Sequence, residues 1–220
     1  EAKARIRRAS ILSERQASRD SLAEKAAIPG RLGAINPAYL FSQLSIAIKP
    51  DDIILHEAVR NQLALVQHIR RPVAKTLARV AGGGLGSSSG MALGVKLARP
   101  EALVIQITGD GAFYFNSPLS ALAVSKKYKL PILTIILDNG GWSAVKTSTL
   151  KMYPEGFASS TDEHASDIGV DANFSNLSSV FDCKGYYLED PDKVTEVLTS
   201  ALADARQGSS VILHVKITPH

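Results

Sequence analysis

Residues 102–141 read ALVIQITGDGAFYFNSPLSALAVSKKYKLPILTIILDNGG and are the most informative part of the chain for the fold class. Two apolar runs, 102–108 and 131–137, are typical of strands that are buried on both faces of a parallel sheet. Between them, Ser117-Pro118 predicts the start of a helix over 118–127. A strand, a helix and a second strand in this order predict one crossover unit of a parallel sheet.

The sequence on both sides continues this alternation of short apolar runs and longer helical segments. Asn36-Pro37 is typical of a helix N-cap and first helical residue. The stretch 82–90, GGGLGSSSG, is typical of a loop between a strand and a helix. The further elements that we expect are helices over 37–48, around 63–67, over 91–98 and over 191–206, and strands over 53–56, 76–81, 185–188 and 210–217. The chain is therefore predicted to be an α/β protein with a doubly wound parallel sheet flanked by helices.

Two short polar segments directly follow the two buried strands: Gly109, Asp110 and Gly111 follow the first, and Asn139 begins the second segment. Ligands of open parallel sheets bind outside the carboxyl ends of the strands, where both segments fall. Asp110 and Asn139 are 29 positions apart, which is close to the roughly 30 residues of a strand-helix-strand unit. A carboxylate, an amide oxygen and a nearby backbone carbonyl are hard oxygen ligands that suit Mg²⁺. Gly111 would also let the backbone approach a phosphate closely.

Either segment alone is more typical of a simple turn than of a binding site. The pair at crossover spacing, with both members after buried strands, favours the binding site.

The same residues resemble the thiamine-diphosphate enzymes typified by acetolactate synthase, benzoylformate decarboxylase and pyruvate decarboxylase. The resemblance covers roughly residues 36–219, which correspond to their C-terminal cofactor domain. In that family a GDG segment is followed 25 to 30 residues later by paired asparagines, and here Asp138 replaces the first of them. The resemblance implies thiamine diphosphate and Mg²⁺ as cofactors. It implies Asp110, Asn139 and the carbonyl oxygen of Gly141 as metal ligands.

The resemblance also implies further cofactor contacts. The loop at 82–90 is similar to the family loop under the cofactor, so Leu85 is expected to be the apolar wedge that bends the cofactor for catalysis. The turn after the first strand is expected to contact the aminopyrimidine. The full set of expected cofactor-binding residues is Glu57, Ala58, Val59, Gly83, Gly84, Leu85, Gly109, Asp110, Gly111, Ala112, Asn139 and Gly141.

The activity implied by the resemblance is cleavage or formation of a carbon–carbon bond next to a ketone, as in a 2-oxo acid decarboxylase or an acetolactate-synthase-like carboligase. The bound cofactor acts as an electron sink in such reactions. In that family the catalytic glutamate lies on an N-terminal pyrimidine-binding domain, usually that of a partner subunit. We therefore expect a small 2-oxo acid or related substrate, such a domain as partner, and a homodimer or homotetramer.

The sequence also allows two interpretations from other functional classes. GLGSSSG at 84–90 is close to Gly-x-Gly-x-x-Gly, and Asp110 lies about 20 residues downstream, as in a nucleotide-dependent oxidoreductase. This loop has one extra residue before its last glycine, and the alternative leaves DNGG at 138–141 unexplained. A non-catalytic protein that keeps the cofactor domain only for assembly is the second alternative, and the intact ligand residues argue against it.

The basic charge of the chain is concentrated at its start. Glu1 to Lys25 holds seven Lys and Arg against four Asp and Glu, which leaves 18 against 17 in the remainder. We interpret residues 1–30 as a helical linker from a preceding domain, 31–220 as the cofactor domain, and expect no nucleic-acid partner. Because the chain starts at Glu1 without an initiator methionine, we expect it to belong to a longer polypeptide.

No apolar run approaches the roughly 20 residues that span a bilayer, so we expect a soluble chain without a membrane partner. The lone Cys183 fits a reducing compartment, which predicts an intracellular location, cytoplasmic or organellar. The region 142–173 has no persistent periodicity and is interpreted as a functional loop or a partly disordered one. We expect it to close over the cofactor.

Overall fold

The computed structural model describes residues 2–80, 82 and 84–219, and its centre is a six-stranded sheet in which every neighbouring pair is parallel. The strand order is β4-β3-β5-β6-β8-β7. Their bounds are β3 (Ile53–Glu57), β4 (Leu77–Arg79), β5 (Val104–Gly109), β6 (Leu133–Asp138), β7 (Lys184–Leu188) and β8 (Val211–Lys216). The predicted α/β class and parallel sheet are confirmed.

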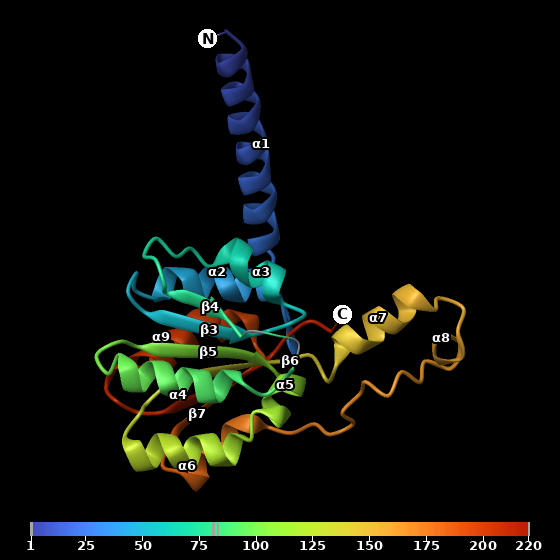
Figure 1. Cartoon of the computed structure of the whole chain (residues 1–220). Coiled ribbons are helices and arrows are strands. Elements are labelled where there is room, and N and C mark those ends of the chain that lie inside the picture. Colours follow the sequence, from blue (N-terminus) through green and yellow to red (C-terminus); the bar gives the residue numbers. More distant parts are fainter. Residues whose placement is uncertain (1, 81, 83, 220) are drawn as a thin grey trace.

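Helices cover both faces of this sheet (Figure 1). One face carries α2 (Pro37–Ala47), α3 (Gln62–His68) and α9 (Val194–Arg206), which share one apolar core with the strands. The other face carries α4 (Ser88–Ala98) and α6 (Pro118–Tyr128), which form a smaller core. Alternation along β5 explains the two cores, because Ile105 and Ile107 belong to the first and Val104 to the second.

The N-terminal helix α1 (Ala2–Ala26) stands away from this body (Figure 1), and its described side chains are exposed along most of its length. Asn36 connects the C-terminal end of α1 to the body. Its side chain accepts from the Ala38 N–H as N-cap of α2, and it also donates to the carbonyls of Lys25 and Ile28. A short hairpin, β1 (Gly30–Arg31) with β2 (Ala34–Ile35), follows. None of the helices in the described part of the chain combines the length and apolar character needed to cross a membrane.

One predicted boundary is wrong near the carboxyl ends of the strands, and one helix there was not predicted. The loop expected over 82–90 ends earlier, because α4 begins at Ser88, and a short helix α5 (Asp110–Phe115) directly follows β5. The start of α4 is fixed by Glu57, a distant carboxylate that accepts from the N–H groups of Gly86, Ser87 and Ser88. Such a contact leaves no mark in the local sequence.

The region 142–173 is also more helical than predicted, since it contains the helices α7 (Ser143–Met152) and α8 (Phe157–Thr161). A 3₁₀ segment η1 (Phe174–Val180) follows it, and a second one, η2 (Pro191–Lys193), precedes α9. Neither α7 nor α8 buries a residue, so neither has an apolar face that periodicity could reveal. Both helices project from the body of the molecule (Figure 1).

Candidate functional site: a carboxylate-lined hollow at the strand ends

The carboxyl ends of β3, β5 and β6 meet at one hollow of about 210 Å³. The sheet register brings them there, since Glu57 pairs with Thr108 and Gly109 pairs with Leu137. Ten residues predicted for the site line this hollow: Glu57, Ala58, Val59, Leu85, Gly109, Asp110, Gly111, Ala112, Asn139 and Gly141. The topology therefore brings together segments that lie more than 80 positions apart in the sequence.

The remaining two predicted residues lie in the glycine-rich loop. Gly84 lines an adjoining hollow of about 90 Å³ that shares Leu85 and the turn at 57–59. Gly83 lies outside the described residues. Leu85, the expected wedge, is 37 % exposed and lines both hollows, so its side chain is available to a ligand.

Asp110 is a buried carboxylate with few partners. Its Oδ1 accepts from the Gly111 N–H at 2.8 Å and its Oδ2 accepts from the Gly140 N–H at 3.0 Å. Burial raises the pKa of Asp110 to about 7, the nearby Asp138 carboxylate acts in the same direction, and the two N–H groups act against it. An ionised Asp110 is therefore unfavourable here unless a cation compensates its charge.

Asn139 and Gly141 complete the turn that faces Asp110. The Asn139 Oδ1 accepts from the Gly141 N–H at 3.3 Å and its Nδ2 donates to the Ser143 Oγ at 2.8 Å. Gly141 has a φ of +155°, and a Cβ there would collide with the carbonyl of Ser166. A glycine is thus required at position 141, where the turn lies against the backbone of Ser166.

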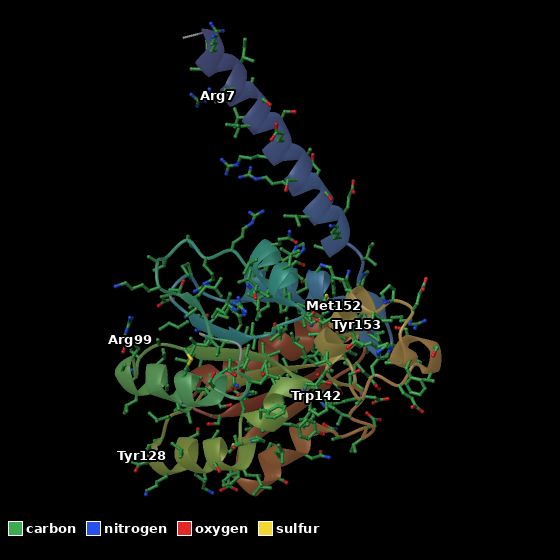
Figure 2. The ribbon with its side chains drawn as sticks, turned by 45° about the vertical axis from the view of Figure 1, so that its right-hand side comes forward. Arg7, Arg99, Tyr128, Trp142, Met152 and Tyr153 are labelled. Atoms are coloured by element: carbon green, nitrogen blue, oxygen red, sulfur yellow. The ribbon has the colours of Figure 1, made fainter. Side chains whose placement is uncertain are left out.

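Trp142, which is labelled in Figure 2 and was not among the predicted site residues, packs against Gly111. A Cβ on Gly111 would collide with the Trp142 indole, and the ring centroid of Phe115 lies 6.0 Å from that of Trp142. The indole Nε1 is buried and has no hydrogen-bond partner among the described residues. A buried donor without an acceptor is costly, and an anionic group placed in this hollow would supply the acceptor.

Asp138 is a second residue that the sequence analysis did not include. Its Oδ1 accepts from the Gly140 N–H at 2.9 Å, and its Oδ2 accepts from His214 Nε2 at 2.8 Å and Lys216 Nζ at 2.9 Å. Burial acts to raise the pKa of Asp138, but the hydrogen bonds from His214 and Lys216 outweigh it and hold this pKa well below its usual range. The replacement of the first asparagine by Asp138 was a visible signal, but His214 and Lys216 lie far along the chain.

Glu57, which the resemblance implied as a contact of the aminopyrimidine, is hydrogen-bonded within the chain. Both of its carboxylate oxygens are engaged within the chain, by the N–H groups at the start of α4, by the Ser88 hydroxyl at 2.7 Å and by the Asn116 amide at 2.8 Å. Gln106 and Thr134 extend this buried network beneath α4. Glu57 lines the hollow while its charge is directed away from it.

The donor set of this edge fits Mg²⁺ and a diphosphate. Asp110 supplies a carboxylate, Asn139 an amide oxygen and Gly141 a carbonyl, which are hard oxygen ligands. In the described part of the chain, no group of three or more His, Cys, Asp or Glu side chains could hold a metal ion. The remaining ligands of such a metal would have to come from water and the phosphate oxygens of a bound group.

Known proteins match this chain in sequence and in structure. The family model for the C-terminal TPP-binding domain of thiamine pyrophosphate enzymes matches residues 58–215. Human 2-hydroxyacyl-CoA lyase 2 is 29 % identical over 199 residues, which cover 88 % of this chain and 29 % of that protein. Acetolactate synthase of Mycobacterium avium is 27 % identical over 173 residues, which cover 78 % of this chain and 27 % of that protein.

Among solved structures, the thiamine diphosphate-dependent 4-hydroxybenzoylformate decarboxylase of Rhodococcus jostii RHA1 superposes with a TM-score of 0.73 at 24 % identity. The superposition covers 86 % of this chain and 33 % of that one, and it supports the fold. The chain spans less than a third of the length of the two curated relatives. With the family model covering most of its length, the chain belongs to the thiamine pyrophosphate enzymes and forms their C-terminal TPP-binding domain.

Proposed function

We propose that this chain holds the diphosphate of thiamine diphosphate (TPP) through Mg²⁺ ligated by Asp110, Asn139 and the carbonyl of Gly141. The enzyme that contains it would cleave or form a carbon–carbon bond next to a ketone. The observation that carries the proposal is the state of Asp110, a buried carboxylate with two amide donors and a second carboxylate nearby. Mg²⁺ would supply a positive charge beside Asp110, since the nearby Lys216 ammonium is hydrogen-bonded to Asp138 instead.

The chain's own residues would bind and orient the cofactor. Leu85 would support its bend, Gly111 would allow close approach of a phosphate, and the Trp142 Nε1 would donate to a phosphate oxygen. Since the charge of Glu57 is engaged in the chain, the turn would meet the aminopyrimidine mainly through Ala58 and Val59. When bound, TPP supplies an electron sink for the bond that is formed or cleaved.

The proposal includes the rest of the enzyme. The substrate would be a small 2-oxo acid or a related compound, as the names of the decarboxylase and acetolactate synthase relatives suggest. Residues 31–220 would be the cofactor domain and residues 1–30 a helical linker from a preceding domain. A pyrimidine-binding domain of the same or a partner chain would complete the site in a homodimer or homotetramer, in the cytoplasm or an organelle.

Several exposed apolar side chains of the region 142–173 support a covering role for this region. Met152 and Tyr153 at the end of α7 are 69 % and 66 % exposed (Figure 2), and Phe157 in α8 is 77 % exposed. The start of the region and its later segment 166–168 meet at the turn 139–141, here called the metal turn: the Trp142 N–H donates to the Ser166 carbonyl at 2.7 Å and the Ile168 N–H donates to the Gly140 carbonyl at 3.3 Å. A bound metal at this turn would thus touch the base of the region.

The test measures TPP binding to the complete enzyme by calorimetry, before and after metal removal with EDTA. We expect TPP affinity to fall by at least about a hundredfold without metal, equivalent to about 2.8 kcal/mol, and to return with added Mg²⁺. Product analysis with a panel of 2-oxo acids then tests the activity. Metal-independent binding would contradict the Mg²⁺ site, and binding without turnover of any 2-oxo acid would favour a non-catalytic cofactor domain.

A further inference from the structure

Asp138 lies between the metal turn and two side chains of β8. The parallel register pairs Ile136 with His214 and Asp138 with Lys216. The side chains of residues two apart in a strand point to the same side of the sheet, so His214 and Lys216 both reach the carboxylate at the end of β6. Asp138 is 6 % exposed and the His214 residue 0 %, so water does not replace these contacts.

The hydrogen bonds fix which atoms of this group donate. The Phe174 N–H donates to the His214 Nδ1 at 3.2 Å, whereas the Asn173 Oδ1 lies farther from the same atom, at 3.5 Å. The shorter contact makes Nδ1 an acceptor and assigns the ring proton to Nε2. His214 Nε2 and Lys216 Nζ then both donate to the Asp138 Oδ2. Because Oδ2 accepts both of these hydrogen bonds, the Oδ1 of Asp138 is the oxygen that accepts from the metal turn, through the Gly140 N–H.

One backbone proton is shared between the two carboxylates of the site. The Gly140 N–H lies 2.9 Å from the Asp138 Oδ1 and 3.0 Å from the Asp110 Oδ2. If Asp110 turns this oxygen toward a cation, the N–H keeps a charged acceptor only because Asp138 is there. An asparagine at position 138 has a single acceptor oxygen, which cannot serve Gly140 on one side and His214 with Lys216 on the other.

We propose that Asp138 is a positioning residue that holds the metal turn through the Gly140 N–H, with His214 and Lys216 compensating its charge, and so frees Asp110 to ligate Mg²⁺. This inference rests on the proposed function. It concerns a residue that departs from the paired asparagines of the family pattern. Asp138 touches neither metal nor cofactor in this role and acts through Gly140.

The experiment measures the Mg²⁺ dependence of TPP binding to the complete enzyme by calorimetry, together with the metal-free midpoint of thermal unfolding. Asp138→Asn is expected to weaken the apparent Mg²⁺ affinity by about tenfold, equivalent to about 1.4 kcal/mol. Lys216→Met is expected to weaken it by about threefold, a loss of about 0.65 kcal/mol. Because both act through one carboxylate, the double variant should be no weaker than Asp138→Asn alone.

Asp171→Asn is the matched control. Asp171 accepts from the same Lys216 Nζ at 2.8 Å, but its side chain is 84 % exposed and does not contact the metal turn. We expect its Mg²⁺ affinity to stay within about twofold of the wild type, since exposed ion pairs contribute little.

The outcomes separate this inference from the function on which it rests. If the wild type binds TPP with Mg²⁺ and Asp138→Asn keeps the same Mg²⁺ affinity, the inference is overturned even if unfolding shifts, because Asp138 is then only structural. If Asp138→Asn does not fold, unchanged affinity in Lys216→Met overturns it instead. A wild type without Mg²⁺-dependent binding overturns both proposals.

Discussion

Glu57 and Asp110 are two buried carboxylates at the same edge of the sheet, and their surroundings are opposite. They are 5 % and 3 % exposed and lie at the ends of the neighbouring strands β3 and β5. Glu57 accepts five hydrogen bonds from donors of its own chain. Asp110 accepts two and has the Asp138 carboxylate nearby.

The difference separates a carboxylate that stabilises the fold from one that we propose as a metal ligand. A buried charge with a complete set of donors stabilises the structure around it, because removing it leaves those donors unsatisfied. A buried charge with an incomplete set and a like charge nearby disfavours its own ionised form. Burial alone would not distinguish the two residues, whereas their partners do.

The largest effect is expected from Asp110→Ala, which should abolish Mg²⁺-dependent TPP binding. The substitution removes both a metal ligand and the negative charge that attracts the cation. The metal-free stability should stay the same or rise, since an unfavourable buried charge is lost. Calorimetry of the complete enzyme measures the TPP affinity, and thermal unfolding measures the metal-free stability. Unchanged TPP affinity would refute the metal-site assignment.

The second largest effect is expected for the stability of Glu57→Gln. This substitution should lower the free energy of unfolding by about 2–4 kcal/mol, because the amide N–H groups of the new glutamine would face the N–H and O–H donors that now bond to the Glu57 carboxylate. Denaturant unfolding measures it, with the exposed Glu155→Gln as control, for which a change within about 0.5 kcal/mol is expected. If Glu57→Gln lowered the free energy of unfolding no more than Glu155→Gln does, the contrast between Glu57 and Asp110 would disappear.

A smaller, kinetic effect is expected from Leu85→Ala, which should leave the fold intact and lower turnover about tenfold while changing TPP affinity much less. The wedge would set the shape of the cofactor and contribute little to holding its phosphates, so the loss is in the rate. Met91→Ala on α4, where the side chain is 36 % exposed, is the control. Equal losses of affinity and rate would contradict the wedge, and a stability loss of about 2–5 kcal/mol would make Leu85 structural.

The smallest effect is expected in the region 142–173, which should be cut by protease several times more slowly when TPP and Mg²⁺ are bound. Its start and its segment 166–168 meet at the metal turn, and its exposed apolar side chains would be covered on closure. Cleavage within α1 provides the internal control, since it should not change. Equal cutting rates in the region with and without cofactor would identify it as a passive surface segment.

The sheet and the two turns at Asp110 and Asn139 could be predicted because they depend on residues that are adjacent in the sequence. Apolar runs predict the strands, and the turn residues directly after them fall at one edge by topology alone. Ten of the twelve residues proposed for the cofactor line one hollow for this reason.

The partners of these residues could not be predicted in the same way. The hydrogen bond of His214 to Asp138 joins positions 76 apart, and that of Asn116 to Glu57 joins positions 59 apart. No local pattern selects such pairs, so the engagement of Glu57 by the start of α4 and the contacts of Asp138 with β8 could not be predicted. The helix α7 was overlooked for another reason, since it buries none of its residues.

The most direct test of the contrast between Asp110 and Glu57 is a crystal structure of the complete enzyme with TPP and Mn²⁺, in which the anomalous signal locates the metal. We predict one peak between the side chains of Asp110 and Asn139 and the Gly141 carbonyl, at about 2.1 Å from each ligand oxygen, with Glu57 still bonded to the start of α4. A metal bound at Glu57, or a TPP site in which Asp110 ligates nothing, would contradict the account.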